Sequence, residues 1–175
     1  NALNVLHCVA NQLTNLDVTQ INSLTKLRCS GNQLSTLNIS QNTSLTEIFC
    51  SSNQLTNLDI TQNLDLSFLR CSSNSLSNLD LTQNVAIDTL NCDLNILTNL
   101  DVSQNINLVN LSCFQNQIVS LDISQNTNLI SLNCGVNQLT NLDVTKNVSL
   151  TALFCGINQL TNIDITQNPL LVYFT

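Results

Sequence analysis

The sequence has few charged and few aromatic residues, which amount to 9% and 3% of its 175 positions. In a typical globular protein about a quarter of the residues are charged. Four basic and eleven acidic side chains give a net charge of −7, and nucleic acid is not expected as a partner because phosphate backbones select basic surfaces. No apolar run approaches the ~20 residues of a transmembrane helix, so we also expect no membrane insertion.

Residue combinations that support catalysis are also scarce. The chain has one histidine, His7, only three glycines, and neither a Gly-rich loop nor a Cys-x-x-Cys pair. Phosphate-binding loops need closely spaced glycines, and metal sites need clustered ligands. We therefore expect that the protein is not an enzyme and uses no cofactor and no metal, and that His7 is solvated.

The chain does contain a strict internal period of 21 residues, which cysteine and asparagine both follow. A column of Leu or Ile beginning at Leu3 keeps the same step. Repeats of this length indicate a solenoid in which each unit is stabilised by its neighbours. The cysteines are Cys8, Cys29, Cys50, Cys71, Cys92, Cys113, Cys134 and Cys155. The asparagines are Asn11, Asn32, Asn53, Asn74, Asn95, Asn116, Asn137 and Asn158.

One repeat reads L-x-x-L-x-C-x-x-N-Q-L-T-N-L-D-V-T-Q-N-x-x. Its first part, as in residues 132–139, resembles the leucine-rich-repeat consensus with Cys in the third apolar position, and residues 139–147 nearly repeat that pattern. The chain is therefore similar over its whole length to the nested (IRREKO-type) bacterial leucine-rich repeats. This resemblance implies a right-handed coil, a ligand surface on the first strand of each repeat, and an extracellular or cell-surface location.

The domain organisation follows from the same count. Residues 1–175 are expected to form a single domain of eight 21-residue repeats and a partial ninth. The chain has no methionine and no signal peptide and opens inside a repeat, at Asn1 and Ala2. We expect it to be a fragment of a larger protein.

Two segments in each repeat alternate apolar and polar residues, as at Leu6/Cys8 and at Leu16/Val18. A period of two indicates a strand, and no segment has the 3.6-residue spacing of a helix. The sequence predicts an all-β-rich solenoid with two short parallel strands per repeat and little or no helix. Equal strand spacing of about 4.8 Å on both sides predicts a straight stack.

The cysteine and asparagine columns are expected to be structural. Each cysteine takes an inward Leu position, and stacked side chains with parallel Cα–Cβ vectors are poorly placed for a disulfide. Free core thiols are therefore favoured, with disulfides or metal as the alternatives. Each asparagine follows a strand, where a buried amide can pair backbone groups of its own and the adjacent coil.

A column of acidic residues faces outward from the second segment. It contains Asp17, Asp59, Asp80, Asp101, Asp122, Asp143 and Asp164, with Asn38 in the second repeat. A row of carboxylates could bind Ca²⁺, but Ca²⁺ needs six or more converging oxygens, so a solvated face with each Asp bonded to the Ser or Thr two residues on is favoured. Repulsion within the row is expected to raise some of these pKa values. Ice binding by this regular face is disfavoured because Asp occupies its middle column.

The outward positions of the first strand, in contrast, differ from repeat to repeat. They hold three of the four basic residues and four of the five phenylalanines, and exposed aromatic and Arg side chains are typical of binding hot spots. We expect Phe49, Phe68 and Arg70 to cluster. The candidate ligand-binding residues are Lys26, Arg28, Glu47, Phe49, Phe68, Arg70, Asn91, Asp93, Phe114 and Phe154.

These residues predict a non-catalytic module for protein–protein interaction or adhesion. A polysaccharide or matrix ligand is the first alternative, although sugar sites favour Trp and Tyr, and the chain has no Trp and only Tyr173. A rigid spacer without a ligand is the second alternative.

Overall fold

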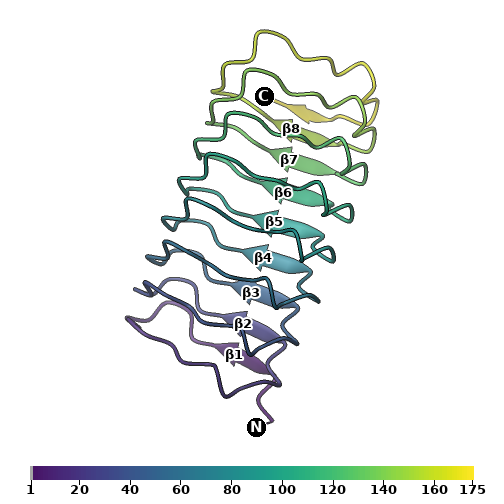
Figure 1. Cartoon of the computed structure of the whole chain (residues 1–175). Coiled ribbons are helices and arrows are strands. Elements are labelled where there is room, and N and C mark those ends of the chain that lie inside the picture. The colour runs from purple at the N-terminus through teal and green to yellow at the C-terminus, as the bar shows by residue number, and fades with distance from the viewer. Residues whose placement is uncertain (1) are drawn as a thin grey trace.

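The computed structural model describes residues 2–175, and Asn1 lies outside the described residues. The chain winds as a right-handed solenoid of eight stacked coils and begins a ninth (Figure 1). Residues 2–175 contain no helix, which confirms the predicted class, and no described segment is a helix that could cross a membrane.

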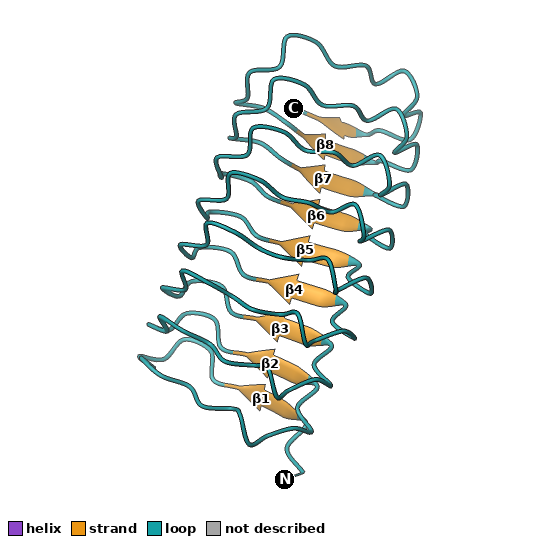
Figure 2. Ribbon diagram, in the orientation of Figure 1, coloured by secondary structure: helices purple, strands orange, loops and turns teal. Residues whose placement is uncertain are grey.

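Each coil contributes one short strand, and the strands form one parallel sheet in chain order (Figure 2). Every strand pairs with the next in a register of 21 residues, as in Leu27 with Ile48. Equivalent residues therefore lie directly above one another along the stack. The strands are β1 (Val5–His7), β2 (Lys26–Arg28), β3 (Glu47–Phe49), β4 (Phe68–Arg70), β5 (Thr89–Asn91), β6 (Asn110–Ser112), β7 (Ser131–Asn133), β8 (Ala152–Phe154) and β9 (Tyr173–Phe174).

Columns of Leu, Ile, Val and Cys fill the interior between the two sides of each coil. In the inner coils these side chains are almost fully buried, for example Leu69, Cys71 and Leu76. The equivalent Leu6 and Cys8 of the first coil are only partly buried, because that coil has a neighbour on one side alone. Stacking therefore provides the burial that no single coil achieves.

The second segment of each coil is not a strand, and this part of the prediction is wrong. In the described residues the side opposite the sheet has no β-ladder. There Asp59 Oδ1 accepts hydrogen bonds from the N–H and the hydroxyl of Thr61, at 3.0 and 2.7 Å. A short polar side chain thus takes the donor that a ladder would need. With a ladder on one side only, strand pairing does not set the spacing of the coils on the other side, so it does not require a straight stack.

The predicted role of the first asparagine column is confirmed. Asn116 Nδ2 donates to the carbonyls of Cys92 and Cys113, both at 3.1 Å, and its Oδ1 accepts from the N–H of Leu97 at 3.0 Å. From Asn32 to Asn158, each such amide therefore pairs at least three backbone groups that belong to two coils, where the chain turns away from the sheet.

A second asparagine column lies before each strand from β3 to β9 and is bonded differently. Asn126 Nδ2 donates to the carbonyls of Val102 and Asn105, at 2.9 and 2.8 Å. The buried Oδ1 atoms of this column accept no hydrogen bond from the described residues. Buried polar atoms without a partner lower the free energy of unfolding, so this column stabilises the stack less efficiently. Its members are Asn42, Asn63, Asn84, Asn105, Asn126, Asn147 and Asn168.

The eight cysteines occupy the predicted core column and are unbridged in the structure. The pKa of Cys29 is raised to about 12, mainly by burial and to a smaller extent by the neighbouring Cys8. The Cys92 thiol donates to the Ser112 carbonyl of the next coil at 3.5 Å. The thiolate is the reactive species, and a raised pKa keeps a thiol protonated. These buried thiols are therefore expected to be unreactive.

A residue in the left-handed region precedes the first asparagine of every coil, and its conformation is not evident from the sequence because only one of the eight is glycine. Gly31 has a φ of 68°, while Val136 and Ile157 have φ of 55° and 56°. β-Branched residues rarely adopt this conformation. The asparagine bonds and the stacking of the coils hold them in it.

Candidate ligand-binding face

The strand face is the outward surface of the sheet, formed by the first and third residues of each strand. Its middle residues, such as Leu69, point into the core. Because the register is constant, side chains from adjacent strands lie about 4.8 Å apart. The face is thus a flat array on which neighbouring repeats bring their differing side chains together.

Six of the predicted residues form one group on β2, β3 and β4, which we name the aromatic–basic cluster. The rings of Phe49 and Phe68 have centroids 5.3 Å apart and are tilted by 50°. The guanidinium of Arg28 lies 4.7 Å from the Phe49 centroid, and that of Arg70 lies 5.1 Å from both centroids. The expected proximity of Phe49, Phe68 and Arg70 is confirmed. The cluster consists of Lys26, Arg28, Glu47, Phe49, Phe68 and Arg70.

Glu47 holds the basic side of this cluster in place. Its carboxylate lies 3.3 Å from Lys26 Nζ and accepts a hydrogen bond from Arg28 Nε at 2.7 Å. Partial burial acts to raise the pKa of Glu47, but the bonds from Arg28 and Lys26 outweigh it and lower the pKa. Glu47 therefore pairs with two cations, while Arg70 is exposed and has no ion pair among the described residues.

A shallow hollow continues from the cluster along the strand face from β4 to β8. Phe68 and Arg70 border it at one end and Phe154 at the other. Four strand steps separate these ends, a distance of roughly 19 Å. Between them the lining is formed mainly by short amide and hydroxyl side chains: Thr89, Asn91, Asn110, Ser112, Ser131 and Asn133, over Leu90 and Leu111.

The remaining predicted residues do not all present free groups. Asn91 lines the hollow but donates to Asp93 at 3.1 Å, and Asp93 Oδ1 accepts from the Ser112 hydroxyl at 2.6 Å and the Phe114 N–H at 2.7 Å. Asp93 thus joins two coils. Phe114 lies beyond the end of β6, against Gly135, where an added Cβ would meet the ring at 3.4 Å.

Sequence reasoning missed the floor of the hollow. Asn110, Ser131 and Asn133 occupy the variable outward columns, yet apart from Asn91 only aromatic and charged residues were singled out there. The side chains of Asn110 and Ser131 make no hydrogen bond within residues 2–175. The available signal was a run of consecutive repeats with only small polar residues on this face.

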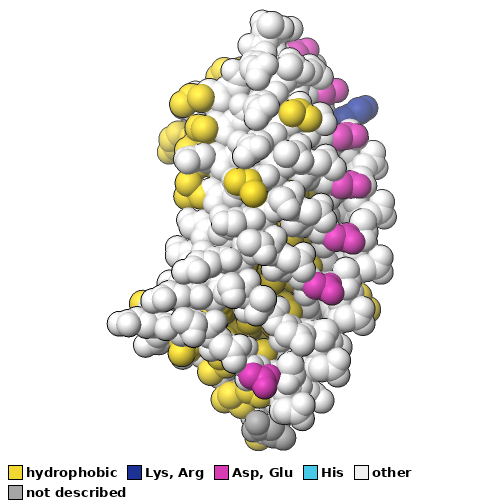
Figure 3. Space-filling model, turned by 60° about the vertical axis from the view of Figure 1, so that its left-hand side comes forward, with side chains coloured by type: hydrophobic (Ala, Val, Ile, Leu, Met, Phe, Trp, Pro, Cys, Tyr) yellow, Lys and Arg dark blue, Asp and Glu magenta, His cyan; other side chains and the backbone are white. Residues whose placement is uncertain are grey.

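The acidic column forms a row along one edge of the molecule (Figure 3). The expected rise in pKa is wrong. The hydroxyl and then the N–H of Thr19 lower the pKa of Asp17, and the N–H and then the hydroxyl of Ser103 lower that of Asp101. Hydrogen bonds to the charged form thus outweigh repulsion from neighbouring Asp side chains. No group in residues 2–175 brings together three or more His, Cys, Asp or Glu side chains able to hold a metal.

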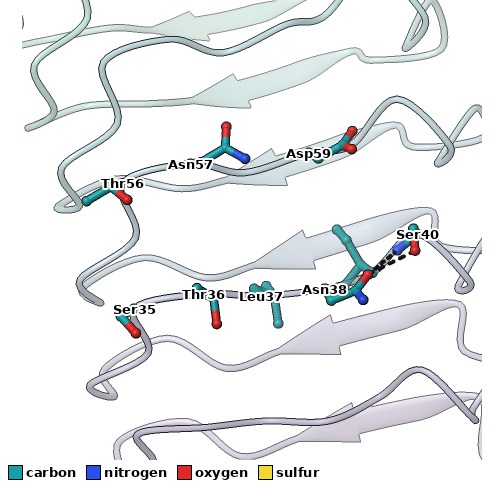
Figure 4. Close-up of a pocket in the computed structure, with 9 residues that line it drawn as sticks. Ser35, Thr36, Leu37, Asn38, Ser40, Thr56, Asn57 and Asp59 are labelled. Carbon is teal, nitrogen blue, oxygen red and sulfur yellow. Dashed lines mark hydrogen bonds between the residues drawn. The ribbon is translucent and has the colours of Figure 1, made fainter.

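Shallow clefts separate adjacent coils on the side opposite the sheet. One is lined by Ser35–Ser40 of one coil and by Thr56, Asn57 and Asp59 of the next (Figure 4). Similar clefts recur along the stack, lined by the equivalent repeat residues. Since the lining hardly changes between coils, these clefts offer little with which to select one ligand.

Neither a protein-family model nor a curated protein sequence matches the chain. Among solved structures, it is similar to the functional domain of InlJ from Listeria monocytogenes, which includes a cysteine ladder. The two share 34% identity and a TM-score of 0.63, over 98% of this chain and 48% of that one. A leucine-rich-repeat protein of Leptospira interrogans matches at 27% identity, with a TM-score of 0.76 over 97% of this chain and 53% of that one.

A third similarity concerns the fold alone. Internalin C2 from Listeria monocytogenes is 22% identical, with a TM-score of 0.92 over 98% of this chain and 80% of that one. The chain spans about half the length of the InlJ and Leptospira structures.

Proposed function

We propose that this chain, which is a leucine-rich-repeat solenoid, is a non-catalytic module that binds a protein ligand through its strand face. The observation that carries the proposal is the aromatic–basic cluster, where the tilted rings of Phe49 and Phe68 lie 5.3 Å apart, each close to the Arg70 guanidinium. Aromatic and Arg side chains contribute most to hot spots in protein interfaces.

The cluster is ordered before any ligand arrives. Arg28 is held between Glu47 and the ring of Phe49, and Arg70 contacts both rings. Side chains that are already in position lose less conformational entropy on binding, which favours affinity. The strand face is also the surface on which repeats differ, as specific recognition requires.

The solved structures of similar fold support a binding role in general, since they include internalins and other leucine-rich-repeat proteins. A polysaccharide ligand is less well supported, because the rings at the hollow belong to Phe68 and Phe154, which have no polar edge. The side opposite the sheet, with its nearly identical coils, fits a framework role.

An extracellular or cell-surface location in a bacterium belongs to the same proposal. Similar solved structures come from Listeria and Leptospira, and the resemblance to nested bacterial repeats points the same way. Susceptibility of the protein to protease added to intact cells would test this location.

The binding role is tested with two matched triple variants. Phe49→Ser/Phe68→Ser/Arg70→Ser removes two rings and a cation from the cluster, whereas Leu64→Ser/Val85→Ser/Lys146→Ser removes two exposed apolar side chains and a cation elsewhere. Each is immobilised and exposed to extracts of candidate host or environmental surfaces. We expect a protein that wild type and the second variant retain and the first loses.

Thermal melts must first show that all three proteins are folded. Equal retention by both variants would remove the cluster from the binding site. Retention by none of the proteins, wild type included, would favour a rigid spacer over a binding module.

A further inference from the structure

The electrostatics of the strand face are unlike those of the rest of the molecule. The chain carries a net charge of −7, yet three of its four basic side chains lie within the aromatic–basic cluster. Glu47 pairs with two of them, Lys26 and Arg28. Arg70 is left as an exposed guanidinium at the mouth of the hollow, ready for a bidentate partner. Charge complementarity thus calls for an anionic group at this end.

The hollow that begins at Arg70 has the dimensions of a short extended segment. It runs across β4 to β8 and ends at the ring of Phe154, roughly 19 Å away at the spacing of parallel strands. An extended chain advances about 3.3 Å per residue, so about six residues cover this distance. Phe154 provides an apolar contact at the far end.

The floor between the two ends suits a peptide main chain. Asn110 and Ser131 have side-chain donors and acceptors that no described residue uses, and Asn133 Nδ2 is free because only its Oδ1 accepts, from the Gly135 N–H at 3.3 Å. These groups lie on the neighbouring strands β6 and β7, in the middle of the hollow. Peptide N–H and C=O groups must be paired when they leave water, and these side chains offer donors and acceptors for them.

We infer that the protein ligand presents an extended acidic segment that lies along this hollow. A carboxylate of the segment pairs with Arg70, its main chain contacts the amide and hydroxyl floor, and a large apolar side chain about six residues away packs on Phe154. The inference rests on the proposed protein-binding function and adds the chemistry and spacing of the partner. The aromatic–basic cluster then lies at the acidic end of the ligand and shields the ion pair from water.

The test is a selection from a phage-displayed library of random twelve-residue peptides on the full chain. Selections run in parallel on wild type, Arg70→Gln, Phe154→Ser and Lys146→Gln, the last removing one cation outside the strand face. Wild type and Lys146→Gln should enrich peptides with an Asp or Glu and a large apolar residue about six positions apart. Arg70→Gln should lose the acidic preference alone, and Phe154→Ser the apolar preference alone.

The most enriched peptide, made synthetically, gives the quantitative measurement. Its dissociation constant in fluorescence anisotropy should rise about tenfold or more with Arg70→Gln and stay unchanged with Lys146→Gln. Enrichment without an acidic residue, no enrichment at all, or equal affinity for Arg70→Gln would overturn the inference. So would Arg70-dependent binding of polygalacturonate in place of the peptides, which would assign the hollow to an acidic polysaccharide.

Failure of this inference is distinguishable from failure of the proposed function. Some peptides or proteins could bind wild type, fail to bind Phe49→Ser/Phe68→Ser and bind equally well when Arg70 or Phe154 is replaced. That result would still support the strand face as a protein-binding surface. Only the acidic segment and its spacing would then be wrong.

Discussion

The two sides of each coil begin from almost the same apolar pattern but are held together in different ways. On the sheet side, backbone hydrogen bonds join every strand to the next, as between β3 and β4. On the opposite side no ladder forms among the described residues, and side chains such as that of Asn126 bond to carbonyls of the preceding coil. The bonds of Asp59 stay within its own coil.

This difference explains where the repeats vary. Where the backbone forms the contacts, outward side chains have no structural task, and the strand face can hold Phe, Arg, Glu or Ser from one coil to the next. Where side chains form the contacts, the residues change little: Asn recurs in all but the first coil of its column, and Asp followed two residues on by Thr or Ser recurs with Asn38 as the one replacement for Asp. Recognition is therefore concentrated on the side stabilised by the ladder.

The largest expected effect comes from the two asparagine columns, compared with the same substitution. Asn116→Leu leaves the carbonyls of Cys92 and Cys113 and the N–H of Leu97 without this partner. Asn126→Leu removes two donated bonds but also a buried oxygen that accepts none. We expect a loss of about 3 kcal/mol in the free energy of unfolding for the first and about 1 kcal/mol for the second. Urea unfolding measures both, and an equal or reversed order would contradict the assigned bonding.

A smaller effect is expected from pH, and it belongs to the side opposite the sheet. Hydrogen bonds from Thr19 and Ser103 lower the folded-state pKa of Asp17 and Asp101, with the same direction for the other five carboxylates of the column. A lowered folded pKa adds stability above the unfolded pKa of about 3.9, and this stability is lost as pH falls through the folded pKa.

Melting temperatures should therefore be level from neutral pH to about 5 and fall below about 4. Replacing Asp59, Asp80 and Asp101 with Asn should make the fall shallower. A steeper fall in that variant would show that repulsion within the row, not hydrogen bonding, governs these groups.

The smallest effect on stability is expected at the left-handed position, which lies at the turn between the two sides of each coil. Ile157 is 78% exposed with a φ of 56°, so Ile157→Gly should relieve strain at little cost in packing. The reverse change, Gly31→Val, places a β-branched residue at a φ of 68° with Ala10 Cα 3.4 Å from the new Cβ. We expect a gain of up to ~1 kcal/mol and a loss of about 1–2 kcal/mol. Calorimetric melts of both variants measure the difference in stability. A loss of stability in Ile157→Gly would show that Ile157 is not strained.

Most of the solenoid framework could be predicted because the same sequence pattern recurs in each repeat. The inward columns, the stacking of equivalent residues and the task of Asn116 follow from eight copies of one pattern. The second strand could not be excluded in this way, since Leu16 and Val18 alternate as a strand does. The competition that prevents it is local, between the Asp17 side chain and the ladder for the N–H of Thr19.

The sequence by itself determined the period, the buried columns and the face on which the repeats differ, because a constant spacing of 21 residues places equivalent side chains in line. Only the tertiary structure decided which of those differing side chains meet. The distance of 5.3 Å between Phe49 and Phe68, the pairing of Glu47 with Arg28 and the hollow that ends at Phe154 depend on rotamers and on packing across strands. Such contacts join residues 19 or more positions apart, and a repeat pattern does not encode them.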